Sequence, residues 1–258
     1  MSTNQTSFEQ QRPYGSLLVT ADPDDLARKA ADRIFDWASE KNGLVFIALS
    51  GGDTPRRTYQ QLAGERYLSR FPWPRVHWYW GDERFVSSDD KQSNYRMVRE
   101  ALFDVAPVPP GNVHPIPTAG ISPNDAAAEY ERLLRRMYTE DGREPGAPLF
   151  DICLLGLGKD GHTASLIPRA PALDDTLHWV AVVAGRRPET RITLTYSAIN
   201  LSRHVVFLVS GSEKRAILRA VTAGSSTVPA ARLHPLGDIV FIADSAAAGA
   251  SPPAMGGL

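Results

Sequence analysis

The chain has 258 residues, a formal net charge of -1, and 43% hydrophobic and 22% charged residues, which is ordinary for a globular protein that buries a core. The near-neutral charge gives no basic excess to neutralise a nucleic-acid backbone, so we expect no nucleic-acid partner. The single cysteine, Cys153, excludes an internal disulfide and a cysteine-based zinc site.

Neither a membrane span nor a signal peptide is predicted. No run of about 18 apolar residues occurs, and the polar residues 1–13 lack the apolar segment of a secretory signal. We therefore expect a cytoplasmic protein that does not enter the membrane.

Apolar runs that predict strands alternate with helical patterns along the first half of the chain. Asp22 is a typical helix cap, and Pro23 fits the first helical position after it. Apolar residues spaced by four predict one buried face of this helix: Leu26, Ala30, Ile34 and Ala38. The other elements predicted in this half are strands over 16–20, 43–50 and 76–83, and helices over 93–103 and from Ser122 onward.

The second half continues the alternation. It predicts strands over 149–158, 179–183, 191–195, 204–211 and 238–244, and a helix over 213–221. The whole pattern predicts an α/β fold: a doubly wound, mostly parallel, Rossmann-like sheet flanked by helices in a single domain over 15–245. The polar residues 1–14 and the Gly- and Pro-rich residues 246–258 are expected to be flexible tails.

In such sheets ligands bind beyond the carboxyl ends of the strands. The residues just after each apolar run are therefore the functional candidates. Polar, glycine-rich segments stand at these places: SGGDTP (50–55), GDER (81–84), GKDGH (158–162) and SGSEK (210–214).

The segment SGGDTP has the features of a phosphate site. A buried strand ends at Ser50, Gly51 and Gly52 turn the chain, Thr54 can cap a helix, and Pro55 fits its first turn. The glycines let backbone N–H groups approach a ligand, and the helix that follows offers its positive dipole end. The segment is not a Walker loop, and a tight turn without a ligand is the alternative.

The segment GDER mixes carboxylates with a guanidinium. Asp82, Glu83 and Arg84 could bind sugar hydroxyls and an oxyanion together, since Arg presents several fixed donors. A surface ion-pair cluster is the alternative. Asn94 is expected to return to the same cleft.

The segment over 154–168 has two interpretations. Gly156, Gly158 and Gly161 match the G-x-G-x-x-G fingerprint of dinucleotide binding. That fold needs a helix after the third glycine, but Pro168 follows seven residues after Gly161 and permits at most a short one. The pattern also lies in the second half of the chain, so a catalytic loop is favoured.

His162 is the residue that points to catalysis in this loop. An imidazole accepts a proton near neutral pH, and Asp160 is close enough to orient it. No H-x-H or H-x-x-x-H spacing occurs, so a zinc site is not expected. The remaining histidines are interpreted as hydrogen-bonded structural residues: His77, His114, His178, His204 and His234.

Three cations complete the candidate set. Lys214 lies near the start of a late helix, and Arg187 and Arg191 precede or open a strand. Each could supply positive charge to a phosphate, although an isolated cation of this kind is more often simply solvated.

The motifs LSGGDTP, W-x-GDER-x-V followed by SNY, and LGLGKDGHTASLIP together resemble the 6-phosphogluconolactonase family over residues 15–245. This family is related to the glucosamine-6-phosphate isomerases, whose loop resembles DGHIAFNEP. Here Ile167 stands in place of the isomerase glutamate, which favours the lactonases. The lactonase pattern usually reads SLFPG, and the departures at Ile167 and Arg169 are expected to alter the shape of the pocket.

The resemblance implies hydrolysis of 6-phospho-D-glucono-1,5-lactone to 6-phospho-D-gluconate in the oxidative pentose phosphate pathway. It implies no metal or organic cofactor, and a monomer or weak homodimer. His162 would activate water and Asp160 would orient the imidazole. The residues expected to bind the substrate are Ser50, Gly51, Gly52, Thr54, Asp82, Glu83, Arg84, Asn94, Gly161, Ser165, Arg187, Arg191 and Lys214. An amino-sugar-phosphate isomerase/deaminase and a non-catalytic sugar-phosphate-binding protein are the alternatives.

Overall fold

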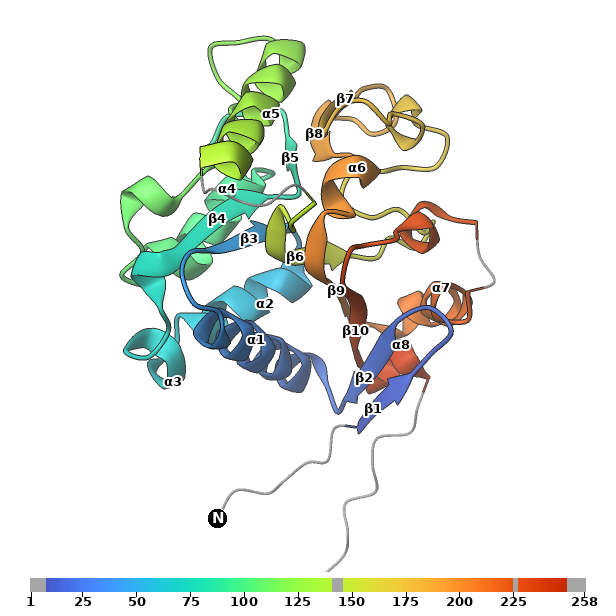
Figure 1. Ribbon diagram of the computed structural model, residues 1–258. Coiled ribbons are helices and arrows are strands. Elements are labelled where there is room, and N and C mark those ends of the chain that lie inside the picture. The colour runs from blue at the N-terminus through green and yellow to red at the C-terminus, as the bar shows by residue number, and fades with distance from the viewer. Residues whose placement is uncertain (1–7, 141–145, 225–226, 250–258) are drawn as a thin grey trace, which may run out of the picture.

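The computed structural model describes residues 8–140, 146–224 and 227–249 (Figure 1). Its centre is a seven-stranded sheet in the order β1-β2-β10-β9-β6-β3-β4, parallel except for β1, which pairs antiparallel with β2. The strands are β1 (Phe8–Gln11), β2 (Ser16–Thr20), β3 (Val45–Leu49), β4 (Val76–Trp80), β6 (Phe150–Gly156), β9 (Ser202–Val209) and β10 (Asp238–Asp244).

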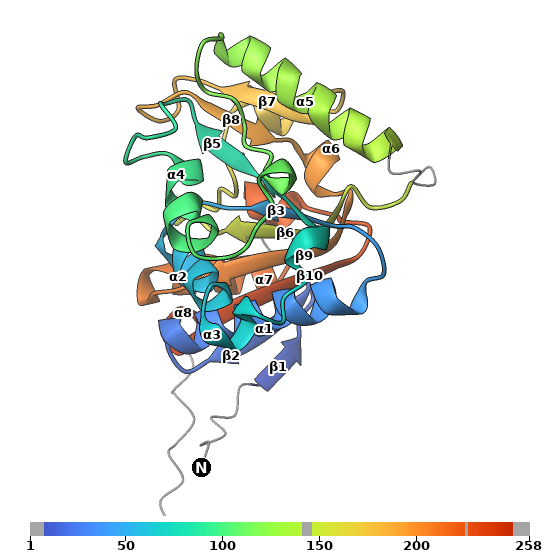
Figure 2. The same ribbon diagram turned by 90° about the vertical axis from the view of Figure 1, so that its left-hand side faces the viewer.

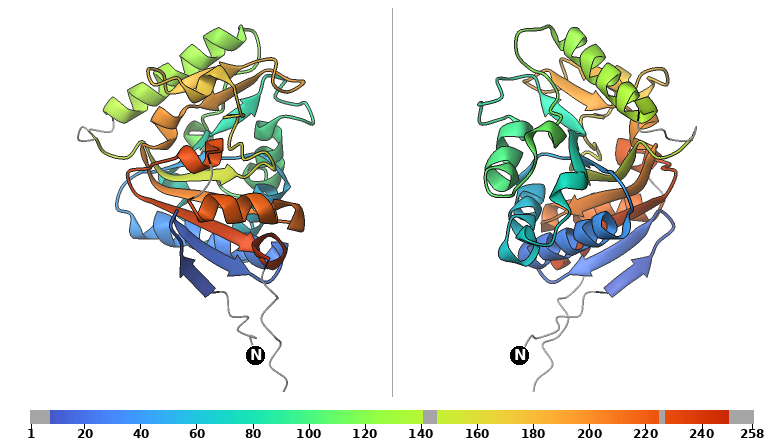
Figure 3. Two further views of the ribbon diagram at one scale, coloured as in Figure 1. Left: turned by 90° about the vertical axis from the view of Figure 1, so that its right-hand side faces the viewer. Right: turned by 60° about the vertical axis from the view of Figure 1, so that its left-hand side comes forward.

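Helices cover both faces of this sheet, as the two opposite side views show (Figures 2 and 3): α1 and α2 lie on one face, and α7 and α8 on the other. The longer elements are α1 (Pro23–Glu40), α2 (Asp53–Leu62), α5 (Pro123–Glu140) and α7 (Arg215–Thr222). The shorter ones are α3 (Glu65–Leu68), α4 (Asn94–Val98), which continues into a π-helical turn over Arg99–Phe103, α6 (Tyr196–Ile199) and α8 (Ser245–Ala248). The doubly wound α/β fold predicted from the sequence is confirmed. In the described ranges, no helix combines the length and apolar character that a membrane crossing requires.

The local sequence explains why these elements form where they do. All five residues of β3 are buried, as a strand covered by helices on both faces requires. The Asp22 side chain accepts hydrogen bonds from the N–H groups of Asp24 and Asp25, at 2.9 and 2.8 Å, and Pro23 opens α1. The predicted apolar face of α1 is buried against the sheet.

A second, smaller sheet departs from the prediction of one continuous sheet. It contains three strands in the order β5-β8-β7, all antiparallel, with α5 packed on it. The strands are β5 (Asp82–Arg84), β7 (Val180–Val183) and β8 (Arg191–Leu194). Residues 184–190 join β7 to β8 directly, and so short a link permits only antiparallel pairing.

Part of the segment over 1–14, which was expected to be a flexible tail, forms a strand. Phe8–Gln11 forms β1, which pairs with β2, and residues 1–7 lie outside the described residues. At the other end, α8 occupies the start of the segment that we expected to be loose, and residues 250–258 lie outside the described residues. The local polarity of these segments did not reveal the partners that order them.

We predict that Asp22→Ala lowers the free energy of unfolding by about 1 kcal/mol, because two N–H groups of the first turn of α1 lose their acceptor. Urea denaturation measures this loss. Asp36→Ala is the matched control, since Asp36 is exposed on the same helix and caps nothing. An equal loss in both variants would contradict the capping role.

Candidate functional site

A cavity of about 250 Å³ lies at the carboxyl ends of adjacent parallel strands of the large sheet. It brings together residues from all the candidate segments that follow β3, β4, β6 and β9. The residues that line it are Ser50, Gly51, Gly52, Asp82, Arg84, Asn94, Gly156, Leu157, Gly158, His162, Ala164, Arg191 and Lys214.

The turn from β3 into α2 supplies one wall. Gly52 has a φ of +103°, which favours glycine, and it is the N-cap of α2 without any side-chain cap. A Cβ on Gly51 would overlap the Asn94 side chain, so this glycine permits close packing. The predicted cap was wrong: Thr54 lies inside α2, which begins at Asp53, and Thr54 does not line the cavity. The uncapped helix start is thus left available to an anion.

Glu83 builds the site from behind rather than lining it. It is 2% exposed, and its carboxylate accepts hydrogen bonds from the backbone N–H groups of Asn94 and Tyr95, both at 2.8 Å. Burial raises the pKa of Glu83, although these hydrogen bonds act in the opposite direction. The Asn94 amide in turn donates to the Asp82 carbonyl at 2.8 Å. Glu83, which was expected to bind substrate, therefore holds the start of α4 in place and does not line the cavity.

Ser165 also lies one layer behind the cavity. Its side chain is fully buried, and its hydroxyl donates to the Asp82 carboxylate at 2.6 Å. Its own N–H donates to the Thr193 hydroxyl at 3.1 Å. Ser165 was expected to bind substrate. In the structure it does not line the cavity, and its hydroxyl instead orients Asp82, which does.

Cations dominate the lining. Arg84, Arg191 and Lys214 line the cavity together with a single carboxylate, Asp82. The Arg191 guanidinium lies 3.9 Å from the Asp82 carboxylate, and Lys214 Nζ donates to the Leu157 carbonyl at 2.8 Å. Burial lowers the pKa of both Arg191 and Lys214. Burial disfavours the charged forms of these two side chains, and an anionic ligand nearby would stabilise those charged forms.

Several buried polar atoms of the cavity residues have no hydrogen-bond partner within the described part of the chain. They are Ser50 Oγ, Arg84 Nε, Asn94 Oδ1 and Arg191 Nε. Buried polar groups are nearly always hydrogen-bonded in folded proteins. A polar ligand or water in the cavity could supply the missing hydrogen bonds.

The loop after β6 carries the candidate base. His162 Nδ1 lies 2.5 Å from an Asp160 carboxylate oxygen, and the other oxygen accepts from Arg187 at 2.9 Å. Arg187 also lies 3.3 Å from His162 Nδ1. Because Asp160 engages Nδ1, Nε2 is the ring nitrogen left to exchange a proton with a ligand or water. His162 lines the cavity, whereas Asp160 and Arg187 flank it.

The glycines of this loop serve its packing. A Cβ on Gly158 would overlap the His162 ring, and a Cβ on Gly161 would overlap Val228. Gly161 was expected to bind substrate but does not line the cavity. No helix follows it before the short turn over Pro171–Leu173. This glycine loop therefore lacks the helix that would present its N-terminus to a pyrophosphate, which rules against the dinucleotide interpretation.

The departures at Ile167 and Arg169, which were expected to alter the shape of the pocket, lie outside the lining of the cavity. Ile167 is 5% exposed within the core. Arg169 has a φ of +65°, a left-handed conformation that explains why a glycine suits this position. Ala164, also left-handed with a φ of +47°, does line the cavity. Sequence reasoning missed it, because nothing in the local pattern marks a positive φ at an alanine.

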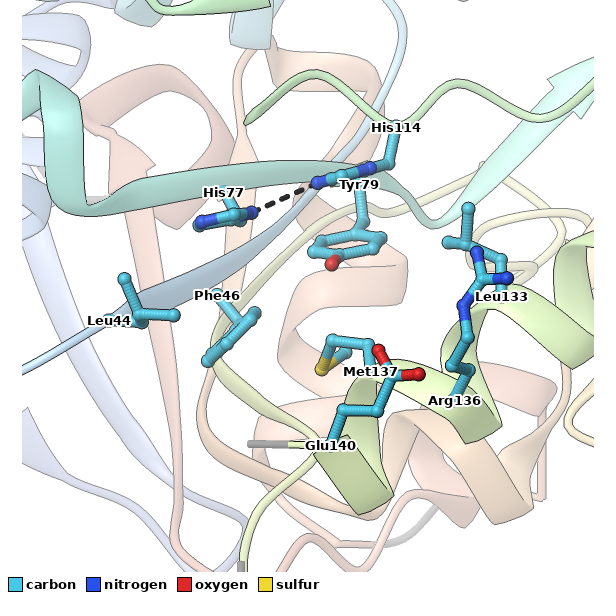
Figure 4. Close-up of a pocket in the computed structure, with 9 residues that line it drawn as sticks. All are labelled: Leu44, Phe46, His77, Tyr79, His114, Leu133, Arg136, Met137 and Glu140. Carbon is cyan, nitrogen blue, oxygen red and sulfur yellow. Dashed lines mark hydrogen bonds between the residues drawn. The ribbon is translucent and has the colours of Figure 1, made fainter. Parts of the chain in front are cut away.

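A second hollow, of about 300 Å³, lies at the amino ends of β3 and β4 (Figure 4). Apolar side chains supply much of its lining, and His77 and His114 are hydrogen-bonded to each other at 3.0 Å. Burial and the neighbouring His77 lower the pKa of His114 to about 4. These two histidines are hydrogen-bonded, as predicted, and no candidate residue of the sequence lines this hollow.

The comparisons with known proteins converge on one family. Residues 21–241 match the model described as glucosamine-6-phosphate isomerases/6-phosphogluconolactonase. The chain is 40% identical over 215 residues to a 6-phosphogluconolactonase of Synechocystis sp., with 81% of this chain and 86% of the relative covered. It is 38% identical over 239 residues to that of Nostoc sp., with 90% and 96% covered. The solved 6-phosphogluconolactonase of Trypanosoma cruzi is 31% identical, with a TM-score of 0.78 over 96% of this chain and 98% of that chain.

We predict that Asp160 titrates well below an ordinary aspartate. Partial burial raises its pKa, but hydrogen bonds from His162 and Arg187 outweigh this and lower it from 3.8 to about 2. Because the folded pKa lies below the unfolded one, the stabilisation is present above about pH 4 and is lost as the pH falls toward 2. Carbon-13 NMR of the carboxyl groups measures the titration. Arg187→Ala should raise this pKa, and a wild-type value near 4 would contradict the arrangement.

Proposed function

The chain belongs to the glucosamine-6-phosphate isomerase/6-phosphogluconolactonase family and has 6-phosphogluconolactonase activity, and we propose that this activity depends on His162 as the general base. The reaction is the hydrolysis of 6-phospho-D-glucono-1,5-lactone to 6-phospho-D-gluconate, a step of the oxidative pentose phosphate pathway. The observation that carries the mechanism is that His162, oriented by Asp160, lines the same cavity as the cations and the open start of α2.

The phosphate of the substrate fits the wall formed by the β3–α2 turn. The first N–H groups of α2 have no side-chain cap, and Gly51 and Gly52 present no side chain that would block an approach. The dipole of the ten-residue α2 adds a partial positive charge at this end. Lys214 and Arg191, which come from the second half of the sequence, add full positive charges to the lining of the same cavity. The anchored phosphate would place the lactone ring toward His162.

The chemical step uses water as the nucleophile. The His162 imidazole takes a proton from water as the water oxygen forms a bond to the lactone carbonyl carbon. The carbonyl oxygen becomes an oxyanion, which an arginine of the cavity stabilises. The bond from the carbonyl carbon to the ring oxygen then breaks, and the imidazolium returns its proton to that oxygen. The product is an open-chain carboxylic acid, which ionises at neutral pH.

Asp160 and Arg187 support the base without lining the cavity. The low pKa of Asp160 keeps its carboxylate ionised, so it can hold Nδ1 and stabilise the imidazolium that forms during the reaction. Arg187 holds the other carboxylate oxygen and limits rotation of Asp160. The predicted substrate contact of Arg187 becomes, in this proposal, support for the base.

Two other activities were weighed. The isomerase alternative would require a carboxylate at the position of the isomerase glutamate, where this chain has the buried apolar Ile167. A coupled assay for released ammonia tests it. A non-catalytic sugar-phosphate-binding protein would bind the ligand without turnover, so lactone hydrolysis above the spontaneous rate decides against it. The cytoplasmic location, the monomer or weak homodimer and the lack of a cofactor requirement stay predictions from the sequence.

We predict that His162→Ala lowers kcat by about 10²–10⁴-fold, because the general base is lost. Lactone hydrolysis followed by NMR, with the spontaneous background subtracted, measures the change. His178→Ala is the matched control, since His178 also bonds an aspartate, Asp175 at 3.0 Å, but does not line the cavity. If His162→Ala keeps the wild-type kcat, His162 is not the base.

We predict that Gly52→Val weakens 6-phosphogluconate binding, because a branched side chain obstructs the anion seat and strains a backbone with a φ of +103°. Calorimetry measures the Kd. Gly120→Val separates obstruction from strain, since Gly120 also has a positive φ, +76°, and lies outside the cavity. Equal affinities in wild type and Gly52→Val would move the phosphate site elsewhere.

A further inference from the structure

Two buried tyrosine hydroxyls occupy equivalent places at the ends of neighbouring strands. Tyr59, from α2, accepts a hydrogen bond from the Ser50 N–H at 3.0 Å and donates to the Ser50 carbonyl at 2.8 Å. Tyr130, from α5, accepts from the Trp80 N–H at 2.8 Å and donates to the Trp80 carbonyl at 3.1 Å. The side chains are 0% and 1% exposed, and neither lines the cavity.

The sheet explains why hydroxyls are needed at these places. Gly81 N–H donates to the Leu49 carbonyl on the β4 side, so the next residue, Ser50, turns its N–H and carbonyl to the opposite side. There the pairing of β3 with β6 ends at Ala48 and Cys153. Tyr59 therefore satisfies backbone groups that the sheet leaves open.

Tyr130 serves the edge of the sheet in the same way. β4 is the edge strand, and the Trp78 carbonyl on its outer side accepts from His114 N–H at 2.9 Å. Residues two apart along a strand direct their backbone groups to the same side, so Trp80 also faces outward. Without Tyr130, both backbone groups of Trp80 would lack a partner in a buried position.

We propose that Tyr59 and Tyr130 are positioning residues for the lactonase reaction: each hydroxyl fixes the last backbone unit of a strand and so holds the turn that carries the binding residues. The proposal rests on the proposed function. Ser50 lines the cavity directly, and Asp82 follows Trp80 by two residues. Ser50 Oγ has no partner within the described residues, so the backbone bonds to Tyr59 anchor this turn.

The hydroxyls are suited to a fixed role and not to proton transfer. Burial raises the pKa of both tyrosines, so each keeps the proton that it donates to a carbonyl. Each hydroxyl already both donates and accepts, and neither reaches the cavity. Removing either hydroxyl would leave a buried N–H and a buried carbonyl without a hydrogen-bond partner. The turn would then shift until these two backbone groups formed other hydrogen bonds.

The test compares three identical substitutions in the full chain. Tyr59→Phe and Tyr130→Phe remove the proposed hydroxyls, and Tyr67→Phe is the control, because Tyr67 is 1% exposed and its hydroxyl bonds Asp32 away from the cavity. Calorimetry gives Kd for 6-phosphogluconate and for inorganic phosphate, thermal unfolding gives Tm, and the lactone assay gives KM and kcat.

We expect Tyr59→Phe and Tyr130→Phe to raise Kd and KM by about 5- to 30-fold, the effect of one or two weakened hydrogen bonds in a ligand site. Tyr67→Phe should lower Tm and leave Kd unchanged. The proposal is overturned if the first two variants lower Tm but bind both ligands like wild type. If the two Phe variants lose affinity for phosphate as expected but the wild type does not hydrolyse the lactone, the proposed function alone would be overturned.

A second measurement covers the case in which a variant does not fold. Amide hydrogen exchange of the wild type reports directly on the N–H groups of Ser50 and Trp80. Both should be protected as strongly as the interior of β3, since each donates to a buried hydroxyl. Exchange at the rate of open loops would show that the tyrosines do not hold these units, and the proposal would fail.

Discussion

The parallel pairing of β9, β6, β3 and β4 is the constraint on which the site depends. Parallel neighbours end at the same edge of a sheet, so the segments after these strands meet although they lie far apart in the sequence. The chain order reverses between β3 and β6, with β4 on one side and β9 on the other. The cavity lies at this switch point, where the diverging loops leave room for a ligand.

The residues that line the cavity are held in place by a second set of residues behind them. Asn94, Asp82 and His162 line the cavity, while Glu83, Ser165 and Asp160, respectively, hold these three residues through short hydrogen bonds. Buried carboxylates are costly unless hydrogen-bonded, and here the bonds that satisfy them also orient the lining. Several polar residues of the motifs therefore do not line the cavity, but their hydrogen bonds orient the residues that do.

Features that depend on the local sequence pattern were predicted correctly, whereas features that depend on pairing with distant segments were missed. Buried strands such as β3, and the Asp22 cap of α1, follow from periodicity and capping chemistry and were correct. The small antiparallel sheet and β1 were missed, because pairing between distant segments leaves no local signal. In the site, position at a strand end identified the segments, but not whether a side chain such as Glu83 faces the cavity or the protein behind it.

The central claim is that one cavity holds an anion seat at the start of α2 and a base at His162, separated by one sugar ring. A crystal structure of the chain with 6-phosphogluconate tests it most directly. The account predicts phosphate oxygens about 3 Å from the first N–H groups of α2 and the product carboxylate beside His162 Nε2. A phosphate bound at His162, or a ligand seated in the hollow beside His77 and His114, would contradict it.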